Sequence, residues 1–293
     1  MNNLVKSHLK LHFVVLLYGF TAILGKLISL PAPQLVWYRM LIAAIILGIF
    51  MRAKSIPFSI GKKNIAKIMG IGVVVAFHWI TFFGAVKISN VSVTLGCMAS
   101  TTLFTSFLEP IVFRKKIKWV EVLIGLIIIS GLYLIFQFEL GYIKGIITAL
   151  TAAFLAGLFT VLNKVFIDEQ HPVTISFYEM LNGFISITIF LAFTGTFNGQ
   201  LVKPTGWDVV FVLILGIVCT AYAFVTAVDV MKVLSAYTVV LAINMEPVYG
   251  ILMAFFIFGS SEFMSAGFYI GTLVILLAVF IHPVLSRQNK KRE

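Results

Sequence analysis

Residues 37–41 read WYRML and residues 177–181 read FYEML, so a tyrosine, a methionine and a leucine recur in the same register. Both stretches lie in runs that are otherwise almost wholly apolar, where a charge of either sign is costly. The arginine of the first stretch is nevertheless replaced by a glutamate in the second. The recurrence indicates a duplicated unit, and the change of sign indicates that its two copies differ in chemistry.

The composition identifies a lipid bilayer as the solvent of this chain. Of its 293 residues, 60% are hydrophobic and 11% are charged, and the mean hydropathy is +1.07. One water-soluble core could not bury so much apolar surface. Runs of about 20 residues, the length of a membrane-spanning helix, lie near Leu11–Leu30, Leu35–Met51, Ile65–Val86, Val91–Phe113, Val120–Phe136, Tyr142–Ile167, Pro172–Thr194, Val209–Val228, Val233–Phe258 and Phe263–Leu285. They lack the alternation of barrel strands, so we predict an all-α polytopic membrane protein with ten transmembrane helices.

The basic residues predict the orientation. With the N-terminus in the cytoplasm, most lysines and arginines lie on the cytoplasmic side, and the opposite loops hold only Lys87, Lys144 and Lys203. The positive-inside rule then places both termini in the cytoplasm, and we expect the chain to lie in the cytoplasmic (inner) membrane. We attribute the net charge of +11 to this topology and to contacts with anionic membrane lipids, and we expect no nucleic-acid partner.

Residues 1–140 and residues 141–293 repeat one another beyond the opening motif. Gly19 and Lys26 recur as Gly157 and Lys164, and Ala85-Val86 recurs as Ala227-Val228. Each half holds five predicted helices, an odd number, so the halves enter the membrane from opposite sides as an inverted repeat. Two such halves can expose a site between them to each side in turn, which is typical of transporters.

These features resemble the EamA family of the drug/metabolite transporter superfamily. The resemblance lies in the Gly-x6-Lys of the first span, the aromatic-Tyr-Arg of the second, the Met-Glu-Pro of residues 245–247, and Glu262 at the opening of the last span. It implies secondary transport, often efflux of amino acids or other small metabolites, through a central cavity built by both halves, with spans five and ten peripheral. The chain departs from the family where a proline is usual in span four, because residues 101–103 read TTL.

Glu246 lies near the midpoint of the ninth span. At helical spacing it shares a face with Tyr249 and Gly250, and Pro247 removes a backbone hydrogen bond and predicts a kink. Two interpretations stay open. The carboxylate faces a substrate cavity, or it is a protonated packing group bonded to a neighbouring helix.

A stripe of hydroxyl side chains predicts a matching wall on the fourth span. Thr101, Thr105 and Glu109 fall on it. The alternatives are that the hydroxyls bond to carbonyls of their own helix and that Glu109 pairs with Lys115 or Lys116 at the inner end.

His78 and Trp79 lie in the third span. A histidine there could bind substrate or a coupling proton, or it could be a neutral packing residue with one nitrogen satisfied. Trp79 could stack on an aromatic ligand, although ordinary helix packing also explains it.

Arg39 and Glu179 are the charged residues of the repeated motif. Each lies early in its helix, where the helix dipole favours the glutamate and opposes the arginine. Arg39 therefore either reaches the outer interface or holds an anionic group of the substrate. We include both residues in the predicted substrate site.

No enzyme signature is present: the sequence has no HExxH, GxSxG or Walker-A pattern. We predict a secondary transporter of a small metabolite, with no cofactor and no metal; a membrane-embedded lipid-modifying enzyme and a structural membrane protein are the alternatives. Close helix packing is predicted by Gly267 and Gly271 in span ten and by Gly125 and Gly131 in span five. The partner is either a neighbouring helix of the same chain or a second subunit in a homodimer.

Overall fold

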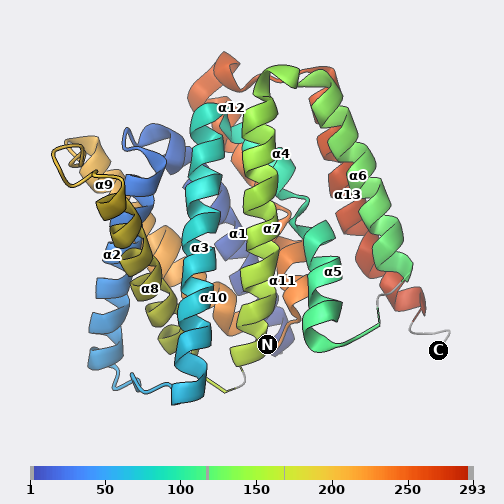
Figure 1. Cartoon of the computed structure of the whole chain (residues 1–293). Coiled ribbons are helices and arrows are strands. Elements are labelled where there is room, and N and C mark those ends of the chain that lie inside the picture. The colour runs from blue at the N-terminus through green and yellow to red at the C-terminus, as the bar shows by residue number, and fades with distance from the viewer. Residues whose placement is uncertain (1–2, 117–118, 168, 290–293) are drawn as a thin grey trace.

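The computed structural model describes residues 3–116, 119–167 and 169–289, and the regular secondary structure in these ranges is helical. Its elements are α1 (Asn3–Leu27), α2 (Ala32–Ala53), α3 (Lys62–Ile88), α4 (Val91–Met98), α5 (Thr101–Phe113), α6 (Trp119–Phe138), η1 (Leu140–Tyr142), α7 (Ile143–Phe166), α8 (Pro172–Phe193), α9 (Trp207–Gly216), η2 (Ile217–Tyr222), α10 (Ala223–Val230), α11 (Ala236–Ile243), α12 (Glu246–Phe258), η3 (Gly259–Glu262) and α13 (Ala266–Asn289) (Figure 1).

The helices have the length and apolarity of a polytopic membrane protein. Within the described ranges, eight helical segments are long and apolar enough to cross a membrane, and two shorter apolar helices, Leu123–Phe138 and Ala266–Ala278, lie in α6 and α13. Each of the ten predicted spans overlaps one helix or a run of two or three consecutive helical elements. The membrane character is therefore confirmed, while ten crossings remain a prediction.

Two of the predicted spans are broken near their middles, and a third changes its helical geometry there. The ninth breaks between α11 and α12 at Asn244 and Met245, as Pro247 predicts, because proline has no amide hydrogen to continue the ladder. The fourth breaks between α4 and α5 at Ala99 and Ser100 with no proline nearby, which the sequence did not predict. The eighth contains the π-helical turn η2.

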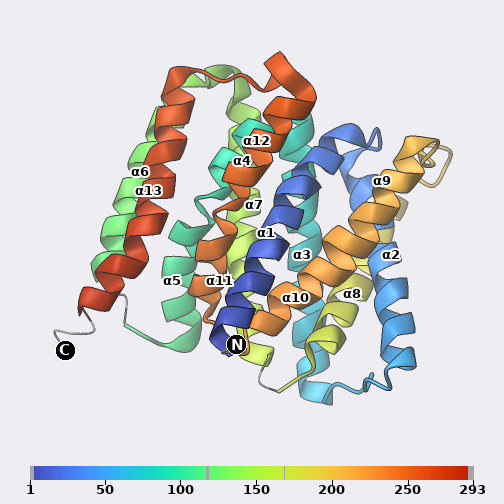
Figure 2. The ribbon, with the colours of Figure 1, turned by 180° about the vertical axis from the view of Figure 1, so that it is seen from behind.

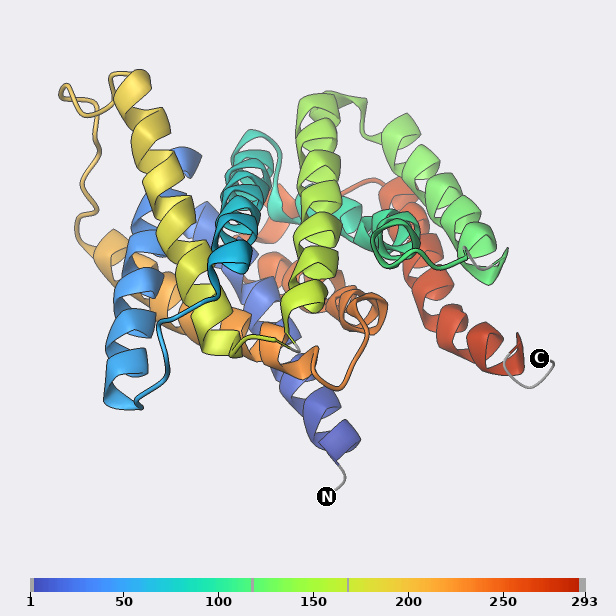
Figure 3. The same cartoon turned by 60° about the horizontal axis from the view of Figure 1, so that its bottom comes forward.

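The molecule has a terminal side, where α1 begins and α13 ends, and an opposite side (Figure 1). Helices α6 and α13 run side by side along one edge, away from α2 and α9 (Figures 1 and 2), and they keep this marginal place when the terminal side is turned forward (Figure 3). Gly131 and Gly271 make this pairing close, because a Cβ at either would lie less than 3 Å from the carbonyl oxygen of the other. The predicted small-residue face is thus used within the chain.

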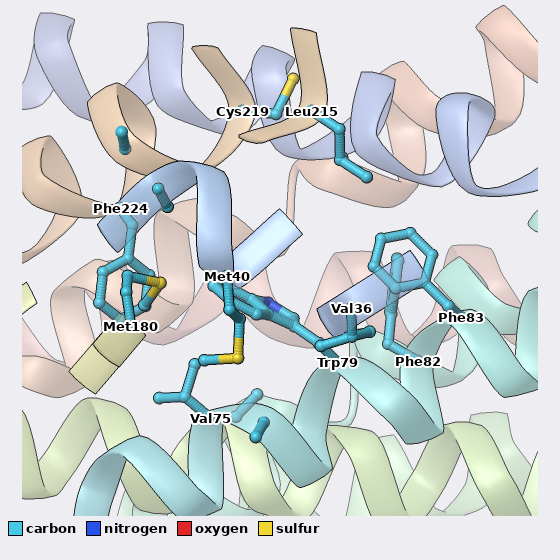
Figure 4. Close-up of a cluster of buried hydrophobic side chains, with 14 of the residues drawn as sticks. Val36, Met40, Val75, Trp79, Phe82, Phe83, Met180, Leu215, Cys219 and Phe224 are labelled. Carbon is cyan, nitrogen blue, oxygen red and sulfur yellow. The ribbon is translucent and has the colours of Figure 1, made fainter. Parts of the chain in front are cut away.

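Part of the larger apolar core lies among α2, α3, α8 and η2, and a second cluster lies among α4, α5, α6, α7 and α13. Met40, Val75 and Phe83 are fully buried in the larger core, and Figure 4 shows the Met40 side chain directed towards Val75. Many large apolar side chains elsewhere are exposed at the surface, as expected where lipid replaces water.

Several repeated positions make matching contacts in the two halves. The hydroxyl of Tyr38 donates to the carbonyl of Val202 at 3.4 Å, and that of Tyr178 donates to the carbonyl of Phe58 at 2.9 Å. Each tyrosine thereby joins the start of its helix to a loop of the other half.

Candidate functional site

A cavity lies among α1, α2, α3, α7, α10 and the interrupted fourth and ninth spans. The space open to the centre of a water molecule is about 80 Å³, several times what one water needs. Its polar lining comes from Tyr18, Thr21, Arg39, His78, Thr101, Thr160, Asn163, Asn244 and Glu246, and its aromatic lining from Trp79, Phe82, Phe159 and Phe224. A mixed lining of this kind suits a small ligand that has both charged and apolar parts.

Arg39 is the cationic group of the cavity. Its side chain is 1% exposed, which contradicts the interpretation that it reaches the outer interface. Its Nε donates to the hydroxyl of Thr220 at 2.5 Å, and its guanidinium carbon lies 3.8 Å from the centre of the Trp79 ring. Its Nη1 has no hydrogen-bond partner among the described residues, so one donor is left for a ligand.

The π-helical turn explains how Arg39 is held. The hydroxyl of Thr220 donates to the carbonyl of Leu215, five residues back, and accepts the Arg39 bond. The carbonyl of Cys219 in the same turn lies 3.4 Å from Nη2 of Arg39. π-Turns often occur at functional sites because they redirect backbone and side-chain groups. No feature of the sequence around Thr220 predicted this turn.

Glu246 is the acidic group of the cavity. It is 6% exposed and begins α12, where the helix dipole favours a carboxylate. Arg39 and Glu246 are close enough to interact electrostatically, yet the ion pairs between described residues do not join them. The cavity therefore presents a cation and an anion that are not paired with each other.

The two helix breaks meet beside Glu246. The side-chain amide of Asn244, at the end of α11, donates to the hydroxyl of Thr102 in the first turn of α5. Thr101 begins α5 as Glu246 begins α12, so Thr101, and not Glu109, occupies the place that corresponds to Glu246. Discontinuous helices that meet at a cavity are a recurrent way to build transporter sites.

The recurring glycines allow these helices to approach. A Cβ at Gly19 would lie 3.0 Å from the backbone nitrogen of Gly250 and 3.3 Å from the carbonyl oxygen of Glu246. A Cβ at Gly157 would lie 2.9 Å from the hydroxyl oxygen of Thr105. The first and sixth spans thus each cross the interrupted span of the other half at a glycine.

His78 and Trp79 both line the cavity, and each side chain also makes contacts within the protein. Nδ1 of His78 donates to the carbonyl of Ala152 at 2.9 Å, which is the packing role considered for it. The Trp79 ring is covered by Arg39 and packs edge-to-face with Phe224 at 5.8 Å between ring centres. The contacts with Arg39 and Phe224 thus occupy the Trp79 ring, as the helix-packing alternative predicted.

Thr105, Tyr249 and Glu179 were also predicted site residues, but they lie outside the cavity lining. From the fourth-span stripe, the lining includes Met98 and Thr101. The hydroxyl of Thr105 donates to the carbonyl of Thr101 at 2.9 Å, the self-bonding alternative for that stripe. Tyr249 is half-buried beside the core. Glu109 accepts from the backbone nitrogen of Tyr237 at 2.8 Å and lies 3.9 Å from the Lys115 ammonium, as the pairing alternative predicted.

Glu179 does not line the cavity but contacts a side chain that does. It is fully buried, and the amide of Asn163, which lines the cavity, lies 3.5 Å from its Oε2. Asn163 was missed by sequence reasoning, although it directly precedes Lys164 of the recurring Gly-x6-Lys motif. Asn244, also missed, precedes the Met-Glu-Pro motif in the same way.

Glu262 closes the packing on the opposite side. It precedes α13 in η3 and is 1% exposed. Its carboxylate accepts from the Lys26 ammonium at 2.7 Å, from the backbone nitrogens of Val91 and Ser92, and from the Ser92 hydroxyl. It thus caps the start of α4 and ties it to the end of α1.

A family model described as the EamA-like transporter family matches residues 6–137 and residues 143–282. The chain belongs to this family. An EamA chain is a membrane transporter. This is a different class of protein from the lipid-modifying enzyme that was the alternative. The predicted resemblance to the EamA family is therefore confirmed.

Two further comparisons agree with this assignment. The EamA chain is 22% identical over 294 residues to the uncharacterized transporter YxxF of Bacillus subtilis (strain 168), covering 96% of this chain and 90% of that protein. It also resembles a protein of known crystal structure with a TM-score of 0.70 and 17% identity, over 96% of this chain and 99% of the other. At that identity the structural likeness shows the fold alone.

Proposed function

We propose that this transporter exports a small zwitterionic metabolite, such as an amino acid, across the cytoplasmic membrane by alternating access. The observation that carries the proposal is the pair of buried, opposite charges, Arg39 and Glu246, on one cavity without an ion pair between them. Leaving both charges without a ligand is costly in a low-dielectric interior. A zwitterion supplies a carboxylate for Nη1 of Arg39 and an ammonium for Glu246.

The size and the walls of the cavity restrict the ligand further. A cavity with about 80 Å³ open to the centres of water molecules favours a small molecule over a large lipid. Phe82, Phe159 and Phe224 line the cavity beside the charged groups, so an apolar side chain on the zwitterion is favoured. Thr101 and Asn244 add neutral hydrogen-bonding groups.

The proposed mechanism rests on two inverted five-helix halves, residues 1–140 and 141–293. Support comes from the matching tyrosine contacts, the two glycine crossings, and the helices that begin at Thr101 and Glu246. Rocking of the halves about these crossings would close one entrance while opening the other.

The cavity and the Glu262 contacts favour export. Asn163 near the end of α7 and Met231 just after α10 extend the lining towards the terminal side, which loop charge assigns to the cytoplasm. On the opposite side, Glu262 ties α4 to Lys26 of α1. A substrate would then load from the cytoplasm.

The test begins with a comparison of intracellular and extracellular metabolites between cells that overproduce the protein and cells that lack it. Each candidate is then measured in proteoliposomes with three compounds: the amino acid and two analogues, its carboxamide and its N-acetyl derivative. Both analogues lose one charge, and we expect both to be transported at least about 10-fold less well, because a charged hydrogen bond contributes about 1.5–3 kcal/mol. Equal transport of all three would refute recognition by Arg39 and Glu246.

A further inference from the structure

Three buried side-chain oxygens without partners belong to Asn163, which lines the cavity, and to two residues of α8. Oε1 of Glu179, Oγ of Ser176 and Oδ1 of Asn163 have no hydrogen-bond partner in the described part of the chain, and all three residues are fully buried. Ser176 lies three residues before Glu179 and so on the same face of α8. Nδ2 of Asn163 lies 3.5 Å from Oε2 of Glu179. Buried polar atoms are rarely left without a partner, so these three call for an explanation.

Within the described part of the chain, no side chain supplies a cation to this carboxylate. Helices α2, α3 and α10 pack against α8, and α7 carries Asn163. The charged and titratable residues on these four helices are Tyr38, Arg39, Arg52, Lys62, Lys63, Lys67, His78, Lys87, Lys144, Lys164 and Asp229. None of those whose side chains are described forms an ion pair with Glu179. Its neighbour in the hydrogen-bond network is the neutral amide of Asn163.

We propose that Glu179, Asn163 and Ser176 form a binding site for a small monovalent cation, H⁺ or Na⁺, that couples to transport. This assigns Glu179 to the coupling ion in place of the substrate, and it rests on the proposed transport function. A carboxylate buried in a membrane protein without a positive partner is strongly disfavoured, and a bound cation removes that cost.

The three side chains suit either cation. With a proton bound, the carboxylic acid donates its O–H to Oδ1 of Asn163 or to Oγ of Ser176, which satisfies an acceptor that otherwise has no partner. With Na⁺ bound, the three oxygens are hard ligands of the kind that such ions prefer. When the cation leaves, Nδ2 of Asn163 remains as a donor to the carboxylate.

Asn163 connects this site to the substrate. It lines the cavity on one side and contacts Glu179 on the other. The backbone of Glu179 packs closely on α3, because a Cβ at Gly72 would lie 2.6 Å from the Glu179 carbonyl oxygen. The site also lies where α8 of the second half packs on α3 of the first. A change in the packing of the halves therefore alters access to the cation and the cavity wall together.

The experiment uses the purified full-length protein in detergent without any substrate. Infrared difference spectra between acidic and alkaline buffer detect the carbonyl stretch of a protonated carboxyl group. Spectra and melting curves at alkaline pH are then recorded with sodium chloride and with choline chloride. The variants are Glu179→Gln and, as a matched control at another buried carboxyl, Glu246→Gln.

Proton binding predicts a titrating carboxyl signal that Glu179→Gln removes, Glu246→Gln retains, and sodium leaves unchanged. Sodium binding predicts that sodium but not choline raises the melting temperature of the wild type and of Glu246→Gln, and has no such effect on Glu179→Gln. If Glu179→Gln has the same titrating signal and the same sodium response as the wild type, the proposal is overturned.

A second variant keeps the test decisive if Glu179→Gln does not fold. Asn163→Leu leaves the carboxyl in place and removes its neutral partner, so the proton or sodium affinity should change about 10-fold, the effect of losing one hydrogen bond. An unchanged affinity overturns the proposal. The experiment contains no substrate, so it tests the cation site separately from transport. If the protein transports a zwitterion but gives a negative result here, the cation-site proposal fails and the proposed function stands.

Discussion

Replacing Gly271 with alanine is expected to force α6 and α13 apart. A methyl carbon at this position would lie 2.6 Å from the carbonyl oxygen of Gly131 and 2.9 Å from Cγ1 of Ile135. Non-bonded carbon atoms pack at about 3.5–4.0 Å, so the helices must separate by roughly 1 Å. Overpacking of this kind costs about 1–3 kcal/mol, and Gly271→Leu should cost more.

Gly70→Ala provides the matched control. Gly70 lies on the exposed surface of α3, and a Cβ there meets no atom within 4 Å. Both alanine variants gain the same helix propensity, about 1 kcal/mol, so their difference in the free energy of unfolding isolates the packing cost.

The assay is the unfolding of both purified variants in one detergent, followed by tryptophan fluorescence. Gly271→Ala should unfold at a lower temperature than Gly70→Ala, by an amount that corresponds to about 1–3 kcal/mol. Substrate selectivity should not change, because none of the described side chains of α13 lines the cavity. If Gly271→Ala is as stable as Gly70→Ala, the close approach of α6 and α13 is refuted.

Three further predictions concern the site and the topology. Glu246→Gln should lower the affinity for a zwitterion at least about 10-fold while the protein still folds; equal binding of substrate by titration calorimetry would reduce Glu246 to a packing residue. Glu262→Gln should loosen the side opposite the termini, because it removes the buried charge that faces Lys26. A cysteine introduced at Ser92 should then react faster with a water-soluble maleimide than it does in a protein that keeps Glu262. An unchanged rate would show that the carboxylate does not hold this side closed. Topology reporters at Ser89 and after Glu293 should report opposite compartments, and the same compartment for both would remove the ten-span model.

Much of the architecture follows from the sequence because lipid imposes simple rules on a chain. Apolar length gives the helical segments, since unpaired backbone amides are not tolerated in a bilayer. Pro247 gives the break beside Glu246, because proline cannot continue the ladder. The recurring WYRML and FYEML motifs direct attention to Arg39 and Glu179, since buried charges are too costly to be incidental.

The tertiary structure alone decides which polar groups meet. The break at Ala99 and Ser100 has no local signal, and the π-turn that brings Thr220 to Arg39 depends on packing between helices distant in sequence. Helical periodicity places Thr105 and Tyr249 on plausible faces, but it does not reveal which neighbour covers each face. Arg39 and Glu246 face one cavity while Glu179 lies behind Asn163, because contacts across the two halves, and not spacing along one helix, set the distances between side chains.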